Sequence, residues 1–86
     1  MNRDEVLDTA KKIVSGDRHQ DYGDAADNFQ RIAAGWSVIL GTDVTLPEVA
    51  LCMDWVKTAR LIQSPDHVDS WVDKAGYSAL GAEVAD

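Results

Sequence analysis

The sequence predicts an all-α domain, a small four-helix bundle-like fold that occupies the whole chain, residues 1–86. Apolar residues recur three and four positions apart in four segments, whereas the strict alternation of a half-buried strand continues nowhere for more than four residues. The two prolines, Pro47 and Pro65, both fall at borders between these segments. At 86 residues the chain has room for one hydrophobic core, so we expect a single domain.

The first helix is expected over residues 3–15 and the second over residues 24–40. Acidic residues at the start of the first helix and lysines near its end suit the helix dipole, and Gly16 is expected to end it. Asp24 is a suitable N-cap for the second helix, and Gly41 follows its last apolar residue. The spacing of apolar residues gives each helix one apolar side.

The third helix has the clearest start signal in the chain. The residues Thr45-Leu46-Pro47-Glu48 form a capping-box pattern with proline in the first turn. This helix is expected to continue to about Gln63, because the residue before Pro65 avoids the helical region. The fourth helix is expected from about residue 66 or 67 to residue 82.

The third helix is apolar on two sides, which predicts either a central place in the domain or a surface shared with a second subunit. We therefore expect a homo-oligomer, a dimer or higher, that completes the small core. Trp36, Trp55 and Trp71 all fall on apolar stripes, and core or interface packing is expected for each, with ligand stacking as the alternative. One stripe of the third helix consists of Val49, Cys52, Met53, Val56 and Ala59, and the other of Leu51, Trp55 and Ile62.

The charge balance limits the possible partners. Eight basic and 15 acidic residues leave a formal net charge of −7, which argues against direct nucleic-acid binding and binding to anionic membranes. The single cysteine, Cys52, lies on a stripe expected to be buried; it excludes an internal disulfide and a cysteine-rich zinc site. The sequence shows no signal peptide and no apolar run of the roughly 18–20 residues that a membrane span needs, so a cytoplasmic protein is expected.

Basic and acidic residues converge where the third and fourth helices meet. The short connection at Pro65 predicts antiparallel neighbours, which places Lys57 and Arg60 opposite the part of the fourth helix that carries Asp69 and Asp73. One interpretation is a pair of interhelical salt bridges. The other is that Asp69 and Asp73 hold Mg²⁺ while Lys57 and Arg60 bind phosphate oxygens of a nucleotide.

The connection over residues 16–24, with the sequence GDRHQDYGD, is long for so small a bundle. Such a polar and aromatic loop is able to lie over a pocket, with Tyr22 stacked on a base and Arg18 or His19 at a phosphate. The alternative is a solvated connector in which the glycines serve the backbone geometry.

Three motifs together resemble a known family. The run GDRHQDYGD, the run Lys57–Leu61 (KTARL) and the run Asp69–Tyr77 (DSWVDKAGY) resemble a family of small phage and prophage proteins catalogued as a domain of unknown function. More distantly, the order of these motifs is similar to that of the MazG-like and nucleotide-modification-associated all-α nucleoside triphosphate pyrophosphatases.

The distant resemblance implies a helical oligomer that holds magnesium and cleaves a nucleoside triphosphate to a monophosphate and pyrophosphate. Asp69 and Asp73 would correspond to the opening and closing acids of the second acidic motif of those enzymes. Their first motif, a paired-acid EExxE, is missing here, and three functions therefore stay open. These are a Mg²⁺-dependent pyrophosphohydrolase, a non-catalytic protein that sequesters a nucleotide or related phosphorylated ligand, and an anti-defence factor that engages a host protein.

Overall fold

The computed structural model describes residues 1–17 and 25–85. Within these residues the chain is helical throughout its regular structure and contains no strand, which confirms the all-α prediction. No helix in this part of the chain is both long and apolar enough to cross a membrane. The elements are α1 (Arg3–Lys12), the π-helical segment η1 (Ile13–Asp17), α3 (Ala25–Leu40), α4 (Leu46–Gln63) and α5 (Val68–Val84).

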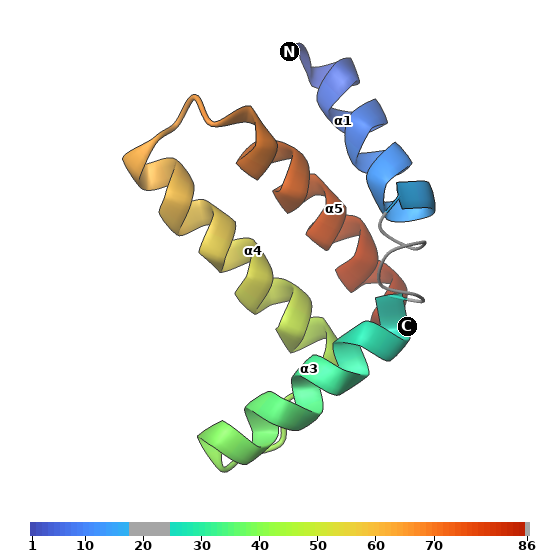
Figure 1. Cartoon of the computed structure of the whole chain (residues 1–86), viewed down its shortest axis with the longest axis vertical. Helices are drawn as coiled ribbons and strands as arrows, with labels where there is room; N and C mark the ends of the chain where they lie inside the picture. The colour runs from blue at the N-terminus through green and yellow to red at the C-terminus, as the bar shows by residue number, and fades with distance from the viewer. Residues whose placement is uncertain (18–24, 86) are drawn as a thin grey trace.

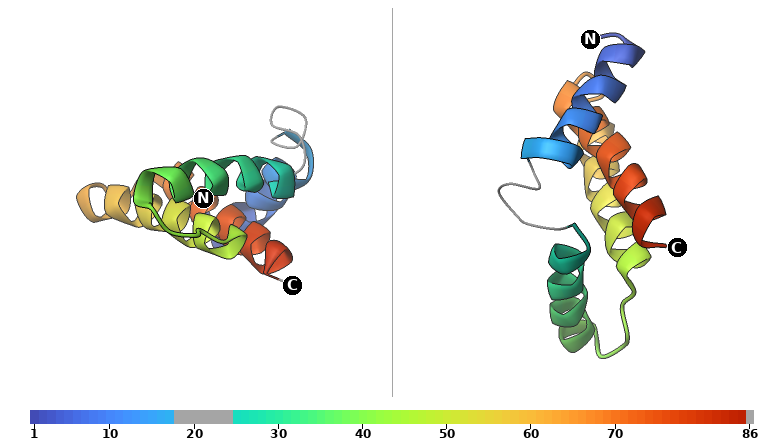
Figure 2. Two further views of the ribbon diagram at one scale, coloured as in Figure 1. Left: turned by 90° about the horizontal axis from the view of Figure 1, so that it is seen from below. Right: turned by 90° about the vertical axis from the view of Figure 1, so that its right-hand side faces the viewer.

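The helices α4, α5 and α1 lie side by side in one layer, with α5 in the middle (Figure 1). The hairpin at Pro65 makes α4 and α5 antiparallel, as expected, and α1 runs in the same direction as α5. The remaining helix, α3, crosses the end of α4 and is displaced toward one face of the layer (Figure 2). The sequence left a central place for α4 open. In the structure α5 takes the central place, with α4 on one side and α1 on the other.

The hydrophobic core lies where α3 meets α4 and α5. Its most deeply buried members are Phe29 of α3 and Val49 of α4, at 1% and 0% exposed. Burying side chains of this kind stabilises the fold by about 1.5–3 kcal/mol each. The buried residues of this cluster are Phe29, Ala33, Val49, Ala50, Tyr77 and Leu80.

The predicted capping box at the start of α4 is confirmed. The backbone N–H of Thr45 donates to Glu48 Oε1 at 2.9 Å, and the backbone N–H of Glu48 donates to Thr45 Oγ1 at 3.3 Å. These two bonds satisfy donors that the first turn of a helix cannot pair internally. The hydrogen bonds from Thr45 favour the ionised carboxylate, and they lower the pKa of Glu48 below its ordinary value of 4.5.

Two glycines of α5 allow its neighbours to approach closely. A Cβ atom placed on Gly76 would lie 3.1 Å from Val14 Cγ1, and one placed on Gly81 would lie 2.9 Å from Ala50 Cβ. At Gly76 the structure thus shows close packing against η1. These two positions therefore fix how near η1 and α4 lie to α5.

One detail at a helix end differs from the prediction. Gly16 does not end the first helix; the chain continues through it in the π-helical turn η1. A glycine ends a helix by adopting a positive φ, and among the described residues only Gly41 does so, at 70°. His67 is the N-cap of α5, but its side chain caps no backbone N–H and instead pairs its Nδ1 with Ser70 Oγ at 2.7 Å. The expected N-cap Asp24 lies outside the described residues.

The predicted burial of Cys52 is wrong for the single chain, and two tryptophans do not pack fully in the core. Cys52 is exposed, and Trp55 and Trp71 are 66% and 47% exposed. Trp36 is half-buried and packs against the core, as expected. The division of α4 into two apolar stripes is only partly right, because Val49 and Met53 of the first stripe pack at the core. Its other members, Cys52, Val56 and Ala59, are exposed beside the second stripe. Core packing is therefore excluded for Trp55, while packing in an interface remains a prediction.

Candidate functional site

The seam between α4 and α5 carries the ion pair that the hairpin register predicted. Lys57 Nζ lies 2.9 Å from Asp73 Oδ2, and the two side chains are 16% and 32% exposed. A partly exposed ion pair of this kind contributes about 0–1 kcal/mol. This ion pair agrees with the structural interpretation for Lys57 and Asp73, whereas Arg60 and Asp69 form no ion pair among the described residues. Phosphate binding by Lys57 and Arg60 stays a prediction.

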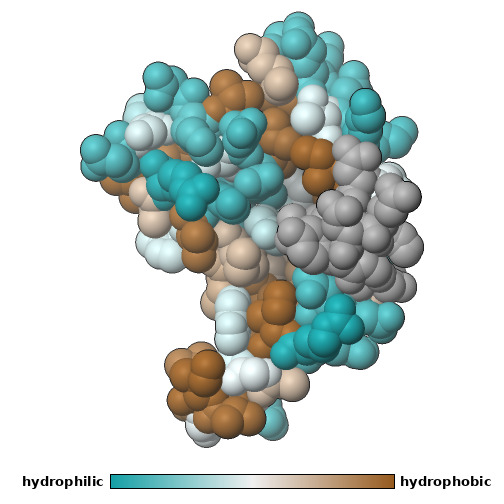
Figure 3. Space-filling model, in the orientation of Figure 1, coloured by the Kyte–Doolittle hydropathy of each residue, from teal (hydrophilic) through white to brown (hydrophobic). Residues whose placement is uncertain are grey.

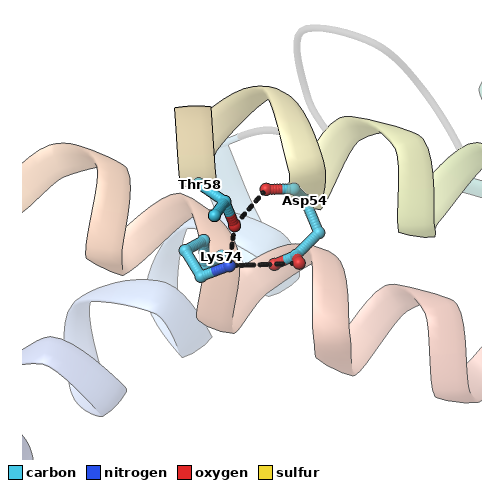
Figure 4. A network of polar contacts seen from close by, with 3 residues as sticks. All are labelled: Asp54, Thr58 and Lys74. Carbon is cyan, nitrogen blue, oxygen red and sulfur yellow. Dashed lines mark hydrogen bonds and ion pairs between the residues drawn. The ribbon is translucent and has the colours of Figure 1, made fainter. Parts of the chain in front are cut away.

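A second polar cluster links the same helices, and its residues were not predicted as a group. Lys74 of α5 donates to both carboxylate oxygens of Asp54, at 3.0 and 3.1 Å, and to the hydroxyl of Thr58 (Figure 4). Thr58 in turn donates from its hydroxyl to the backbone carbonyl of Asp54 at 3.2 Å. The sequence signal that could have identified this cluster is the pair Asp54 and Thr58, an acid and a hydroxyl four residues apart in α4, because such residues share a side of a helix.

The two clusters border different hollows in the surface. Asp73 lines a hollow between α1 and α5 of about 10 Å³, which is the size of one water molecule. Asp54 lines a shallow groove of about 350 Å³ between α4 and α5, whose other walls include Pro47, Leu51 and Ala82. The larger hollow is thus mainly apolar, and its one charged wall residue is an acid that Lys74 already binds.

The other residues proposed from the sequence do not gather into a pocket in the part of the chain that the structure describes. Arg60 and Asp69 are both exposed near the hairpin end of the seam. Among the described residues no group of three or more His, Cys, Asp or Glu side chains lies close enough to hold a metal ion. Mg²⁺ binding by Asp69 and Asp73 stays a prediction. The three loop residues Arg18, His19 and Tyr22 lie outside the described residues.

An uncharged strip runs along the outer side of α4. Leu51, Trp55 and Ile62 are 68%, 66% and 75% exposed, and Val56 is 48% exposed. Positions three and four apart share a side of a helix, so these side chains form one continuous surface. We call it the α4 face, and it consists of Leu51, Cys52, Trp55, Val56, Ala59 and Ile62, all of which are exposed.

A second apolar patch lies at the C-terminal end of α3. Val38, Ile39 and Leu40 are 83%, 78% and 66% exposed. They form the brown surface at the lower end of the molecule in Figure 3. Unlike the α4 face, this patch covers a single turn and ends at Gly41.

The family described as a domain of unknown function, DUF6378, matches residues 5–85. The chain belongs to this family. DUF6378 accounts for nearly the whole chain, which agrees with the resemblance of the sequence motifs to small phage proteins of unknown function.

Two curated relatives of this DUF6378 chain are phage proteins, each called Gene 55 protein. The one from Mycobacterium phage L5 is 42% identical over 76 residues, which cover 87% of this chain and 49% of that protein. The one from Mycobacterium phage D29 is 34% identical over 73 residues, which cover 85% of this chain and 48% of that protein. The chain thus spans about half the length of the curated relatives it matches. No solved structure matches it.

These matches leave the chemistry of DUF6378 open. The more distant resemblance to all-α nucleoside triphosphate pyrophosphatases has no counterpart among them and stays a hypothesis. The chain has two candidate sites. One is the seam in which Lys57 and Lys74 are each bound to an acid, and the other is the exposed α4 face, which no element among the described residues covers.

Proposed function

We propose that this DUF6378 domain is a phage protein-interaction module that binds a protein partner through the α4 face. The observation that carries the proposal is the exposure of Leu51, Trp55 and Ile62, each about two-thirds or more, on one side of one helix. Water-exposed apolar surface of this continuity is uncommon on monomers and is typical of interaction sites. A partner that covers it removes this surface from water, which is the main driving force for association.

The spacing of the α4 face supports a helical or groove-shaped partner. Cys52, Trp55, Val56 and Ala59 stand at positions i, i+3, i+4 and i+7, the pattern of anchors used when one helix docks against another. Trp55 is a suitable central anchor, because tryptophan is enriched among the residues that dominate binding energy. At Leu51 the face continues into the shallow groove between α4 and α5. We place this activity in the cytoplasm of the host, where an exposed thiol such as that of Cys52 stays reduced.

Nucleotide binding at the seam, with or without Mg²⁺-dependent hydrolysis, ranks second. Lys57 would have to leave Asp73 to meet a phosphate, and Arg60 is the other base proposed at this seam. The groove of about 350 Å³ has the volume of a small-ligand pocket, but its one charged wall residue is Asp54, which is bound to Lys74, so its described walls offer no cation to a phosphate. These features favour protein binding over binding of a phosphorylated ligand.

Site-specific photo-cross-linking in cells that carry the phage tests the proposal. A photoreactive residue at position 51 or 62 is expected to cross-link to a protein, and Trp55→Gln is expected to abolish that product. Gln30, exposed on α3, provides the matched control position. Equal cross-linking from positions 30, 51 and 62, or a product that survives Trp55→Gln, would contradict the proposal.

A nucleotide panel tests the second candidate directly. Thermal unfolding is measured with each nucleotide, with and without Mg²⁺, and is followed by analysis of any product. We expect no stabilisation. Stabilisation that Lys57→Met removes would make the seam a nucleotide site, and release of pyrophosphate would make the protein an enzyme.

A further inference from the structure

We propose that the occupant of the α4 face is a second copy of this chain. The two copies would pair through antiparallel α4 helices, related by a two-fold axis that passes level with position 57. This inference rests on the proposed function, because it names the partner of the same surface. Its basis is the arrangement of side chains along the face, their exposure in the single chain, and the amount of surface that pairing would cover.

The centre line of the α4 face has the spacing of a helix–helix seam. Cys52, Trp55, Ala59 and Ile62 follow one another at intervals of three, four and three positions. Apolar residues at alternating intervals of three and four are what two packed helices present to each other. The four positions are symmetric about residue 57, so an antiparallel partner in this register engages all four on each copy.

The sizes of these residues favour the antiparallel arrangement. About position 57, Trp55 of each copy lies opposite Ala59 of the other, and Cys52 lies opposite Ile62. A large side chain then always faces a small one, which is how packed layers interdigitate. A parallel arrangement in the same register would set Trp55 against Trp55 and Cys52 against Cys52. The face is therefore complementary to itself in the antiparallel direction.

Pairing in this way places no charged residue on the centre line of the seam. Asp54 and Lys57 of α4 are turned toward α5 and bound to Lys74 and Asp73. Glu48 and Arg60 are exposed and border the face, Glu48 one turn before Cys52 and Arg60 one turn after Val56. No Asp, Glu, Lys or Arg stands on the α4 face itself. The desolvation cost that makes buried charges unfavourable at an interface is thus avoided along the centre line.

The exposed area matches a weak but specific dimer. Trp55 is 66% exposed and contributes on the order of 100–150 Å², given the size of an aromatic side chain. With the other five residues the face offers roughly 500 Å² per copy, or about 1,000 Å² in a symmetric pair, at the lower limit for specific interfaces. A dissociation constant in the micromolar range is the expectation.

Sedimentation equilibrium of the purified chain over a range of concentrations tests the pairing. The wild-type chain is expected to reach a dimer, and Ala59→Glu is expected to weaken it by about tenfold or more, because a charge is buried at the centre of the seam. Ala34→Glu, a matched change at an exposed alanine of α3, is expected to leave it unchanged. Circular dichroism verifies that both variants are folded, since both alanines are exposed in the single chain.

Disulfide trapping tests the register. In a Cys52→Ser background, cysteines at position 56 lie about 3 Å apart along the helix axis, because each is one residue from the centre. Val56→Cys is therefore expected to form a covalent dimer on oxidation. The native Cys52 residues lie about 15 Å apart along the same axis and are expected to remain free. Efficient cross-linking through Cys52 would overturn the antiparallel arrangement.

The outcomes separate this inference from the proposed function. A chain that stays monomeric at all concentrations overturns the second copy as the partner. Photo-cross-linking from the α4 face to a different protein would then still uphold the proposed function. Association that Ala59→Glu and Ala34→Glu weaken equally also overturns the inference, because it would not pass through the α4 face.

Discussion

Gly81 of α5 packs directly against Ala50 of α4, so closely that a Cβ atom on the glycine would lie 2.9 Å from the Cβ atom of the alanine. Ala50 is a member of the hydrophobic core, and Gly81 lies beside it. The distance between α4 and α5 at this end of the hairpin is therefore set by the absence of a side chain at position 81.

Gly81→Ala is expected to destabilise the fold by about 1–3 kcal/mol, because the added methyl group meets Ala50 and forces the helices apart. Urea-induced unfolding followed by circular dichroism measures the change. Gly35→Ala is the control: nothing lies within 4 Å of a Cβ atom at that position in α3. There the helix propensity of alanine is expected to stabilise the chain by about 0.5–1 kcal/mol. Equal effects at the two positions would contradict the close approach at Gly81.

Lys74→Met is expected to destabilise the chain by about 1–2 kcal/mol, more than Lys57→Met at about 0.5–1 kcal/mol. Lys74 binds both oxygens of Asp54 and the hydroxyl of Thr58, whereas Lys57 makes one ion pair with Asp73. Denaturant unfolding of the two variants gives the comparison. The reverse order of the two effects would show that the Asp54 cluster is not the stronger link between α4 and α5.

The capping box predicts a contribution to stability that depends on pH. The folded-state pKa of Glu48 is lowered from 4.5 by hydrogen bonds from Thr45, so its contribution is complete above that pH and is lost as the pH falls through the lower folded value. Glu48→Gln is expected to reduce the loss of stability in acid. Titration of the Glu48 carboxyl by NMR should give a value below 4.5 in the native protein. A Thr45→Ala variant should return the value toward normal.

The proposed dimer should respond to salt in a direction opposite to that of an ion-pair interface. Each copy carries a formal net charge of −7, so two copies repel one another, while the α4 face itself is apolar. Raising the ionic strength screens the repulsion and is expected to tighten the dimer. Sedimentation at low and moderate concentrations of sodium chloride measures this effect. Weakening by salt would indicate that charged residues, not the α4 face, hold the copies together.

Local signals in the sequence predicted local structure well. The pattern from Thr45 to Glu48 specified the start of α4, and the short connection at Pro65 specified the antiparallel hairpin that brings Lys57 to Asp73. Both depend on residues close in the sequence or on the register of one tight turn.

The packing between distant elements was harder to predict. Periodicity indicated two apolar stripes on α4, but it cannot specify where along the helix circumference the covering elements end. Val49 and Met53 pack at the core, whereas Cys52 of the same predicted stripe is exposed. For the same reason the central place of α5 was missed. It depends on the positions of Gly76 and Gly81 relative to η1 and α4, which involve contacts across most of the chain.

The central place of α5 has a consequence for how the fold opens. Among the described elements, the main contacts of α1 outside its own extension η1 are with α5. The helix α1 can therefore separate as a unit while the α4–α5 hairpin and the core under α3 stay closed. Backbone amides of α1 are expected to exchange with deuterium through this partial opening. Amides around Val49 and Tyr77 are expected to exchange much later, because their exchange requires global unfolding.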